Sequence, residues 1–217
     1  SFNNELITSN NIGQVKNSGP RMGIAVGVGT VGDFMQRSEE SGGLDMAPVT
    51  TNIGYQFEKQ YVGTEHFSAL GELVVNVSGL EQGKFVPSVS LLNGLRFGKA
   101  NWEFAFGPTF SFSKKSYGFF DTDNHFGEGG QYFQTSELDL GAYPDRTLED
   151  FGYKTELNLD SRGGTYFSTR WLMAVGRTFQ SGALNIPVNV YYSSTKGGGF
   201  IGMSVGFNIM TRKKSIN

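Results

Sequence analysis

Alternation of residue type with a period of two is the feature that most limits how this chain can fold. It is clearest in NWEFAFGPTFSFS, residues 101–113, where large apolar rings occupy positions Trp102, Phe104, Phe106, Phe110 and Phe112. Successive side chains of a β-strand point to opposite faces, so this pattern predicts a strand with one strongly apolar face. That face can turn inward, as the core of a soluble sheet, or outward, toward lipid.

The same alternation recurs along most of the chain, and no helical period of any length accompanies it. Eight strands are expected, at residues 21–34, 48–58, 66–78, 84–97, 101–113, 164–178, 183–192 and 200–210. Each reaches the about 9–11 residues that a tilted strand needs to cross a bilayer, whereas no run of about 18 apolar residues exists that could form a transmembrane helix.

The face opposite the apolar one distinguishes the two possibilities. On the first strand it consists of Gly23, Ala25, Gly27 and Gly29, and the strand interiors contain almost no Lys. Only 18% of the chain is charged, against about a quarter in soluble domains. Small residues suit the lumen of an eight-stranded barrel, which has room only for side chains. The sequence therefore predicts an all-β fold, an eight-stranded antiparallel up-and-down transmembrane β-barrel, with a water-soluble barrel or sandwich as the alternative.

The connections between the expected strands alternate in length. Short segments lie around residues 60–65, 98–101 and 180–182, whereas residues 36–47 and 114–163 form longer ones. Outer-membrane barrels place short turns in the periplasm and long loops outside the cell. An even number of strands then puts both termini on the short-turn side.

This alternation predicts the domain organisation. The segments are a periplasmic N-terminal tail at residues 1–20, a transmembrane barrel at residues 21–210 with one long extracellular loop at about residues 114–163, and a periplasmic C-terminal tail at residues 211–217. The chain begins with Ser and not with Met, so we expect a processed chain from which a signal peptide was removed.

A resemblance to a known family follows from these strands. Eight alternating strands, a Gly-rich first strand and the final strand GGFIGMSVGFNI resemble the small eight-stranded Gram-negative outer-membrane β-barrels of the OmpA transmembrane domain and OmpX type. The resemblance covers about residues 21–210. It implies the barrel fold and a location in the bacterial outer membrane, and it implies no activity.

Composition and local motifs limit the chemistry. The chain has no Cys, which excludes thiol catalysis, and its net charge of −2 gives no signal for nucleic-acid binding. Asp121, Asp123 and Asn124 offer oxygen ligands but lack the Gly and Glu that complete a calcium loop, so we expect a solvated acidic loop. His66 and His125 leave a lipid-modifying enzyme open, although no oriented base and third group accompany them. We expect no enzymatic activity, no metal and no cofactor.

Four charged residues fall on the small-residue parity and should point into the lumen. They are Glu72, Arg96, Glu103 and Arg170. Buried charges persist only when they are paired, and Arg96 and Glu103 flank a short turn across which they could pair. The sequence therefore predicts a lumen ion-pair network that includes Glu72 and Arg170. A gated small pore with these groups as its filter is the alternative.

The long segment at residues 114–163 is rich in acidic and aromatic residues. Loops longer than about 15 residues are usually functional or disordered, and exposed aromatic residues suit protein recognition. The candidate partner contacts here are Tyr117, Phe119, Phe120, Phe126, Tyr132 and Phe133. The alternative is a lid in which these residues pack on one another. Residues that keep the strand parity near residue 159 also suggest a hairpin that protrudes beyond the barrel.

The apolar parity is interrupted on two neighbouring strands. Pro87 and Asn93 lie on one of them and Pro108 on the other. A lipid-exposed amide is costly, and a proline removes one donor from the strand ladder. We therefore expect this wall to contact another protein. The alternative is that Asn93 lies near the periplasmic interface and that the prolines mark bulges.

The predicted function is a non-enzymatic outer-membrane β-barrel. We expect a structural or accessory subunit of a larger outer-membrane complex for assembly, secretion or uptake, which uses the long acidic-aromatic loop for contacts. A narrow small-solute pore, a surface adhesion protein and, third, a lipid-modifying barrel enzyme are the alternatives. The expected partners are outer-membrane lipid and other outer-membrane or surface proteins, and no nucleic acid is expected.

Overall fold

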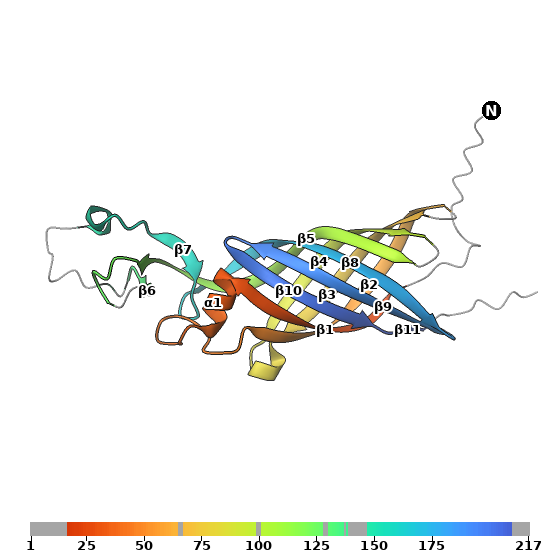
Figure 1. Cartoon of the computed structure of the whole chain (residues 1–217), viewed down its shortest axis with the longest axis horizontal. Coiled ribbons are helices and arrows are strands. Elements are labelled where there is room, and N and C mark those ends of the chain that lie inside the picture. The colour runs from red at the N-terminus through yellow and green to blue at the C-terminus, as the bar shows by residue number, and fades with distance from the viewer. Residues whose placement is uncertain are drawn as a thin grey trace, which may run out of the picture.

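A closed barrel of antiparallel strands forms most of the molecule (Figure 1). The computed structural model describes residues 17–64, 67–98, 101–127, 130–136, 138 and 147–209. The barrel strands are β1 (Gly19–Gly29), β2 (Val49–Gly63), β3 (Phe67–Ser78), β4 (Val86–Phe97), β5 (Trp102–Asp121), β8 (Gly164–Ser181), β9 (Leu184–Thr195) and β10 (Gly198–Gly206). Each strand pairs antiparallel with its neighbours, and β10 pairs with both β9 and β1, which closes the barrel. The predicted all-β, eight-stranded antiparallel barrel is confirmed.

The remaining elements are short. They are α1 (Thr30–Gln36), β6 (Gln131–Gln134), β7 (Glu156–Leu159), β11 (Asn208–Ile209) and the 3-10 helices η1 (Leu80–Gln82) and η2 (Leu148–Phe151). No helix in the part of the chain that the structure describes is long and apolar enough to span a membrane.

The apolar parity faces outward, which answers the question that the alternation raised. On β1, Met22 and Ile24 are 55% and 44% exposed, whereas Arg21 and Ala25 are only 8% and 3% exposed. The other strands repeat this division, and large exposed apolar residues such as Trp171 cover the outside of the barrel. The small and polar residues fill the inside, as expected for a lumen with room only for side chains.

Close packing inside the barrel explains why some inward positions carry glycine. A Cβ atom at Gly107 on β5 would lie 2.0 Å from the backbone oxygen of Leu91, and no rotamer change can relieve a clash with backbone. The β4–β5 pairing is also interrupted at this level, between the pairs Ser90–Thr109 and Asn93–Phe106. Pro108 lies in the interrupted stretch, where its missing N–H removes a ladder hydrogen bond.

The first strand is shorter than predicted. It ends at Gly29, whose φ of +59° lies in the region that favours glycine, and α1 replaces the expected strand to residue 34. The prediction that this strand would continue to residue 34 was therefore wrong. A helix of seven residues is too short to give a clear period, and α1 is held by tertiary burial of Val31 and Met35.

The two ends of the barrel differ, as the alternation of connection lengths predicted. Short connections join β2 to β3, β4 to β5 and β8 to β9 at one end. The first residue of β1 and the last residue of β10 lie at the same end. The other end carries α1, η1 and the long connection between β5 and β8, and also the short turn at residues 196–197 between β9 and β10. The predicted tails lie outside the described residues, except that residues 17–20 lead into β1 and form its start.

The segment expected as one long loop at residues 114–163 is partly strand, so that prediction needs correction. β5 continues to Asp121, and beyond the barrel it pairs with β7 and then with β6. Figure 1 shows these strands protruding from one end of the barrel. We call the described residues between 116 and 159, which include the end of β5, β6, η2 and β7, the extension. The protruding hairpin that the parity near residue 159 suggested is present in this form.

Candidate functional site

A buried ion-pair network closes the lumen toward the short-turn end. Arg96 on β4 donates from Nη2 to Glu58 at 2.6 Å and from Nε to Glu103 at 3.0 Å. The side chains of Arg96 and Glu58 are 6% and 4% exposed. Arg96 and Glu103 therefore pair across the short turn between β4 and β5, and Glu58 on β2 joins them from across the lumen.

A second polar layer lies beside this network. Gln56 on β2 donates to Glu72 on β3 at 3.1 Å and accepts a hydrogen bond from Arg21 on β1. Carboxylate oxygens of Glu58, Glu72 and Glu103 all lie within 4.8 Å of one another, a spacing that three metal ligands could adopt. Arg96 bridges two of these carboxylates, so a guanidinium group supplies the positive charge at this place.

Arg170 lies apart from this network. Its Nη2 donates to Ser111 at 3.2 Å, and its guanidinium lies 5.3 Å from the ring centre of Phe200. Glu72 makes its hydrogen bond to Gln56 instead. The structure thus brings Arg96 and Glu103 together directly and sets Glu72 beside them, but it does not place Arg170 in their group.

Three members of the lumen network were not predicted from the sequence. Arg21, Gln56 and Glu58 all bind within it, although none was proposed as a site residue. A signal for them existed, because Arg21 shares the inward parity of Ala25, and Gln56 and Glu58 share that of Thr50. They stood at the ends of the expected strands, where parity alone does not show whether a residue lies in the lumen.

A large cavity occupies the lumen above these layers. Its volume is about 1110 Å³, and its lining reaches from Arg21 and Glu72 up to α1 and the extension. Glu58, Arg96 and Glu103 are not part of its lining. The cavity therefore ends at the Arg21–Glu72 layer.

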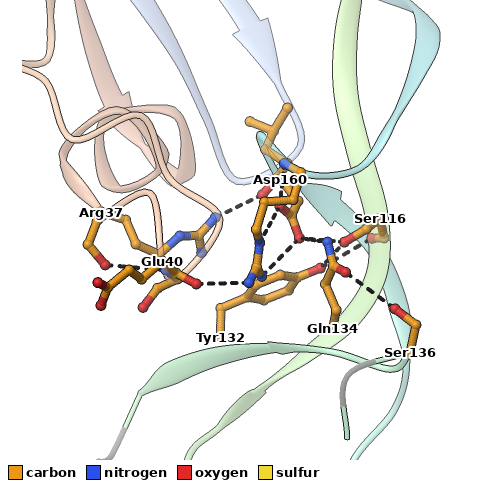
Figure 2. A network of polar contacts seen from close by, with 11 residues as sticks. Arg37, Glu40, Ser116, Tyr132, Gln134, Ser136 and Asp160 are labelled. Atoms are coloured by element: carbon orange, nitrogen blue, oxygen red, sulfur yellow. Dashed lines mark hydrogen bonds and ion pairs between the residues drawn. The ribbon is translucent and has the colours of Figure 1, made fainter.

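Asp160 organises the base of the extension (Figure 2). Its buried carboxylate accepts hydrogen bonds from Ser116 at 2.7 Å and from Gln134 at 2.6 Å, and it forms an ion pair with Arg162 at 3.2 Å. Burial alone would raise the pKa of Asp160, but these donors outweigh it and lower the pKa. One carboxylate thus links β5, β6 and the turn before β8.

The loop between β1 and β2 also holds the extension in place. Arg37 in this loop donates to the backbone oxygen of Leu159 at 2.8 Å, and its guanidinium lies 4.8 Å from the ring centre of Tyr132. Arg162 donates in the opposite direction, to the backbone oxygen of Glu40 at 2.8 Å. Figure 2 shows Arg37, Tyr132 and Asp160 in one network, so the extension is fixed to the barrel mouth from two sides.

Asp121 organises the tip of the extension in the same way. Its carboxylate accepts the backbone N–H groups of His125, Phe126 and Gly127, and the Tyr153 hydroxyl at 2.6 Å. Burial would raise its pKa, but the hydrogen bonds from Tyr153 and the backbone outweigh it and lower the pKa to about 2. Asp121 is 0% exposed, so the expectation of a solvated acidic loop was wrong for this residue.

The histidine that left a lipid-modifying enzyme open as an alternative pairs with a tyrosine. His125 Nδ1 lies 2.9 Å from the Tyr153 hydroxyl, which itself donates to Asp121. Among the residues that the structure describes, His125 makes no hydrogen bond to a serine side chain. His66 lies outside the described residues.

The candidate contact residues of the extension divide into two groups. Phe119 and Tyr132 are 3% and 2% exposed and form its own core. Phe126 and Phe133 are half-buried and pack on Phe119, with ring centres 5.8 and 6.0 Å away. The exposed group consists of Tyr117 and Phe120, at 60% and 42%. Only the second group presents its rings to the surroundings.

The irregular wall on β4 and β5 has the positions that the sequence indicated. Pro87 and Asn93 face outward, and Pro108 is half-buried. The hydroxyl of Tyr61 on β2 lies 3.5 Å from Asn93 Oδ1, so this amide has a polar neighbour on the outer surface. The β4–β5 register is the same on both sides of Pro108, and no bulge occurs between these strands.

These observations define the class of protein. The chain is a closed eight-stranded antiparallel β-barrel with an apolar outside, a polar network that closes one end of its lumen and a structured extension at the other.

Comparison with known proteins adds a likeness in structure. No family model matches the chain, and no curated protein matches it in sequence. Among solved structures, the chain is similar to the crystal structure of Ail, the attachment invasion locus protein of Yersinia pestis, in complex with the heparin analogue sucrose octasulfate. The match has a TM-score of 0.42 and 11% sequence identity, and it covers 90% of this chain and 99% of that chain. We base the fold assignment on the strand pairing of this chain itself.

Proposed function

We propose that this chain is a non-enzymatic β-barrel of the bacterial outer membrane that uses its extension to bind a partner outside the cell, as a surface adhesion protein does. The observation that carries the membrane assignment is the apolar outer surface, on which Met22, Trp171 and Met203 are about half exposed. In water such a continuous surface would drive aggregation. In a bilayer the same surface contacts the lipid chains at little cost. The closed barrel pairs the backbone N–H and C=O groups of its strands with one another.

The two ends of the barrel support one orientation. The connections β2–β3, β4–β5 and β8–β9, the start of β1 and the end of β10 lie at one end. The extension lies at the other, which also carries the short β9–β10 turn. In outer-membrane barrels the short turns face the periplasm. We therefore place the termini in the periplasm and the extension outside the cell.

The extension supports a binding role because its strands are organised before any partner arrives. Asp121 and Asp160 each hold several chain segments together, so the exposed rings of Tyr117 and Phe120 are presented on a fixed scaffold. Fixing the surface in advance lowers the entropy cost of association. Aromatic rings with this exposure are typical of the centres of protein interfaces.

The lumen network disfavours a pore. Arg96 with Glu58 and Glu103, and Glu72 with Gln56, fill the short-turn end of an already narrow lumen. A solute would have to break buried, charge-assisted hydrogen bonds to pass. The role of an accessory subunit in a larger complex differs from adhesion only in the partner of the extension, and we treat it as the second outcome of the test.

The membrane assignment is tested by charge substitutions at two depths. Met203 lies midway along β10, whereas Ile209 on β11 lies at the end of the barrel. In lipid vesicles, Met203→Arg should destabilise the barrel by about 2–4 kcal/mol and Ile209→Arg by about 0–1 kcal/mol, measured by reversible urea unfolding. A chain that is soluble and monodisperse without detergent, or equal effects of both substitutions, would contradict the membrane assignment.

The binding role is tested on intact cells that display the full chain. The double variant Tyr117→Ser with Phe120→Ser should reduce adhesion of these cells to a cultured animal-cell layer, with unchanged amounts of chain at the surface. The matched control is Leu80→Ser, since Leu80 is an equally exposed apolar residue, at 52%, on η1 at the same end of the barrel. If adhesion is unchanged but photo-crosslinkers at Tyr117 capture an outer-membrane protein of the same cell, the accessory role replaces adhesion.

A further inference from the structure

The lumen cavity has a charge opposite to that of the whole chain. Eight of its lining residues are Lys or Arg, whereas three are Asp or Glu. The chain as a whole has a net charge of −2. Lys114 and Lys115 line the cavity toward the extension, and Arg170 lines it within the barrel. The cavity is therefore an electropositive site in an acidic protein.

Arg170 is the most informative of these cations because it is half-buried and has no carboxylate partner among the described residues. Its described contacts are the Ser111 hydroxyl at 3.2 Å and the face of the Phe200 ring. Its Nε is buried and has no hydrogen-bond partner among the described residues. The titratable group that acts on it is the hydroxyl of Tyr191, which is neutral near pH 7. A buried N–H of a charged group costs free energy unless a hydrogen-bond acceptor, best an anion, pairs with it.

The wall next to Arg170 is apolar. Arg170, Leu172 and Ala174 are successive inward residues of β8, and Leu172 packs against a buried cluster made of Val74, Leu92, Ala105 and Ala174. These residues also line the cavity. A water-filled lumen is normally lined by polar residues, so an apolar wall here requires another explanation.

The cavity is closed below this wall. Its lining ends at Arg21 and Glu72, and the Arg96–Glu58–Glu103 network lies outside it. At about 1110 Å³ it is as large as the upper range of small-molecule sites, which span about 300–1,000 Å³. A cavity that ends at a paired polar layer suits binding rather than passage.

We propose that this cavity binds a single-chain amphiphile with an anionic head, such as a fatty acid. The carboxylate lies at Arg170, where it accepts hydrogen bonds from the guanidinium, and the alkyl chain lies against Leu172 and the apolar cluster. An inorganic anion would satisfy Arg170 but leave the apolar wall in water. A neutral lipid would cover the wall but leave the guanidinium without a counter-ion. Phe120 lines the far end of the same cavity, but Arg170 and Leu172, which the proposal uses, lie within the barrel, so the proposal does not depend on the adhesion role.

The proposal is tested with three probes on the full chain in lipid nanodiscs, by isothermal titration calorimetry against empty nanodiscs of the same lipid. Octanoate should bind saturably. Acetate should bind more than about tenfold more weakly because it lacks the methylene groups that become buried. Octanol should also bind more than about tenfold more weakly because it lacks the charge that Arg170 pairs with.

A pair of variants locates the site. Arg170→Gln should weaken octanoate binding by about tenfold or more, the usual effect of removing a hydrogen bond between charged groups. Arg177→Gln is the matched control, since Arg177 lies on the same strand but does not line the cavity. A heat-modifiability gel confirms that both variants form the barrel.

Several results would overturn the proposal. Absence of saturable octanoate binding would do so, and so would equal binding of octanoate and acetate, which indicates an anion site alone. Equal binding of octanoate and octanol would indicate a neutral apolar site. Equal loss in both arginine variants would place the site elsewhere. None of these results bears on adhesion through Tyr117 and Phe120, so the two proposals fail separately.

Discussion

Arg96 on β4 donates a hydrogen bond from each terminal nitrogen of its guanidinium to Glu58 on β2, from Nη1 to Oε1 at 3.1 Å and from Nη2 to Oε2 at 2.6 Å. Strand β3 lies between these strands, so the pair reaches across the inside of the barrel and does not join direct neighbours. A bidentate pair of this kind fixes both side chains in direction as well as in distance. The pair therefore helps to hold β2, β3 and β4 in the curved arrangement of the closed sheet.

Removal of this guanidinium should destabilise the barrel strongly. Arg96→Gln leaves Glu58 and Glu103 as unpaired buried carboxylates, which should cost about 3–5 kcal/mol. Reversible urea unfolding in lipid vesicles measures the change. The control is Lys84→Gln, because Lys84 forms an exposed ion pair with Glu39 at 3.8 Å that should contribute about 0–1 kcal/mol. Equal effects of the two substitutions would show that the lumen network does not support the fold.

A tight approach between β4 and β5 predicts a difference between two glycines. Gly107→Ala should prevent barrel closure or destabilise it by several kcal/mol, because its Cβ would lie 2.0 Å from the Leu91 backbone oxygen. Gly71→Ala is the control within the barrel, since the nearest atom to its Cβ would be the Lys59 oxygen at 3.8 Å. Folding yield and heat modifiability measure both. Normal folding of Gly107→Ala would show that the two strands can move apart at this level.

The tip of the extension should lose order in acid. The folded pKa of Asp121, about 2, lies below its ordinary value of 3.8, so its contribution is present above 3.8 and is lost as the pH falls through about 2. Protection of the Phe126 and Gly127 amides from hydrogen exchange should fall over this interval.

Two substitutions separate this effect from general acid unfolding. Asp121→Asn should lower the protection of these amides already at neutral pH, because it removes the charge that their N–H groups bind. Asp123→Asn should leave it unchanged, since only the backbone N–H of Asp123 bonds within the tip. Acid-independent protection in the unsubstituted chain would contradict the role of Asp121.

The wall that carries Pro87, Asn93 and Pro108 remains a predicted protein contact. A photo-crosslinker at Asn93, which faces outward on β4, should form adducts with another membrane protein in intact cells. The control is a crosslinker at Val205 on β10, which should react only with lipid. Lipid adducts at both positions would show that the Tyr61 hydroxyl, 3.5 Å from Asn93, is sufficient to accommodate the amide at a lipid-facing surface.

The extension shows which part of a site a sequence can predict. The sequence indicated partner contacts for the aromatic residues of the segment at 114–163 and left their packing on one another as the alternative. Part of them do pack on Phe119. The division between buried Tyr132 and exposed Tyr117 was not predictable, because it depends on how β6 and β7 flank β5. Asp121 was expected to be a solvated acid. The backbone N–H groups that bind its carboxylate, those of His125, Phe126 and Gly127, surround it only once the chain has folded into the turn at 121–127.

The sequence by itself determined the number of barrel strands and the face that each side chain occupies. A period of two is a local property of an extended backbone. Because the lumen of a closed eight-stranded barrel is narrow, the face with the large apolar residues has to point outward. Tertiary structure alone decided which charges meet. Arg96 found Glu58 on β2, Arg170 was left with Ser111, and Asp160 reached Ser116 and Gln134. These pairings depend on the relative shift of neighbouring strands and on the curvature of the closed sheet, which no local pattern encodes.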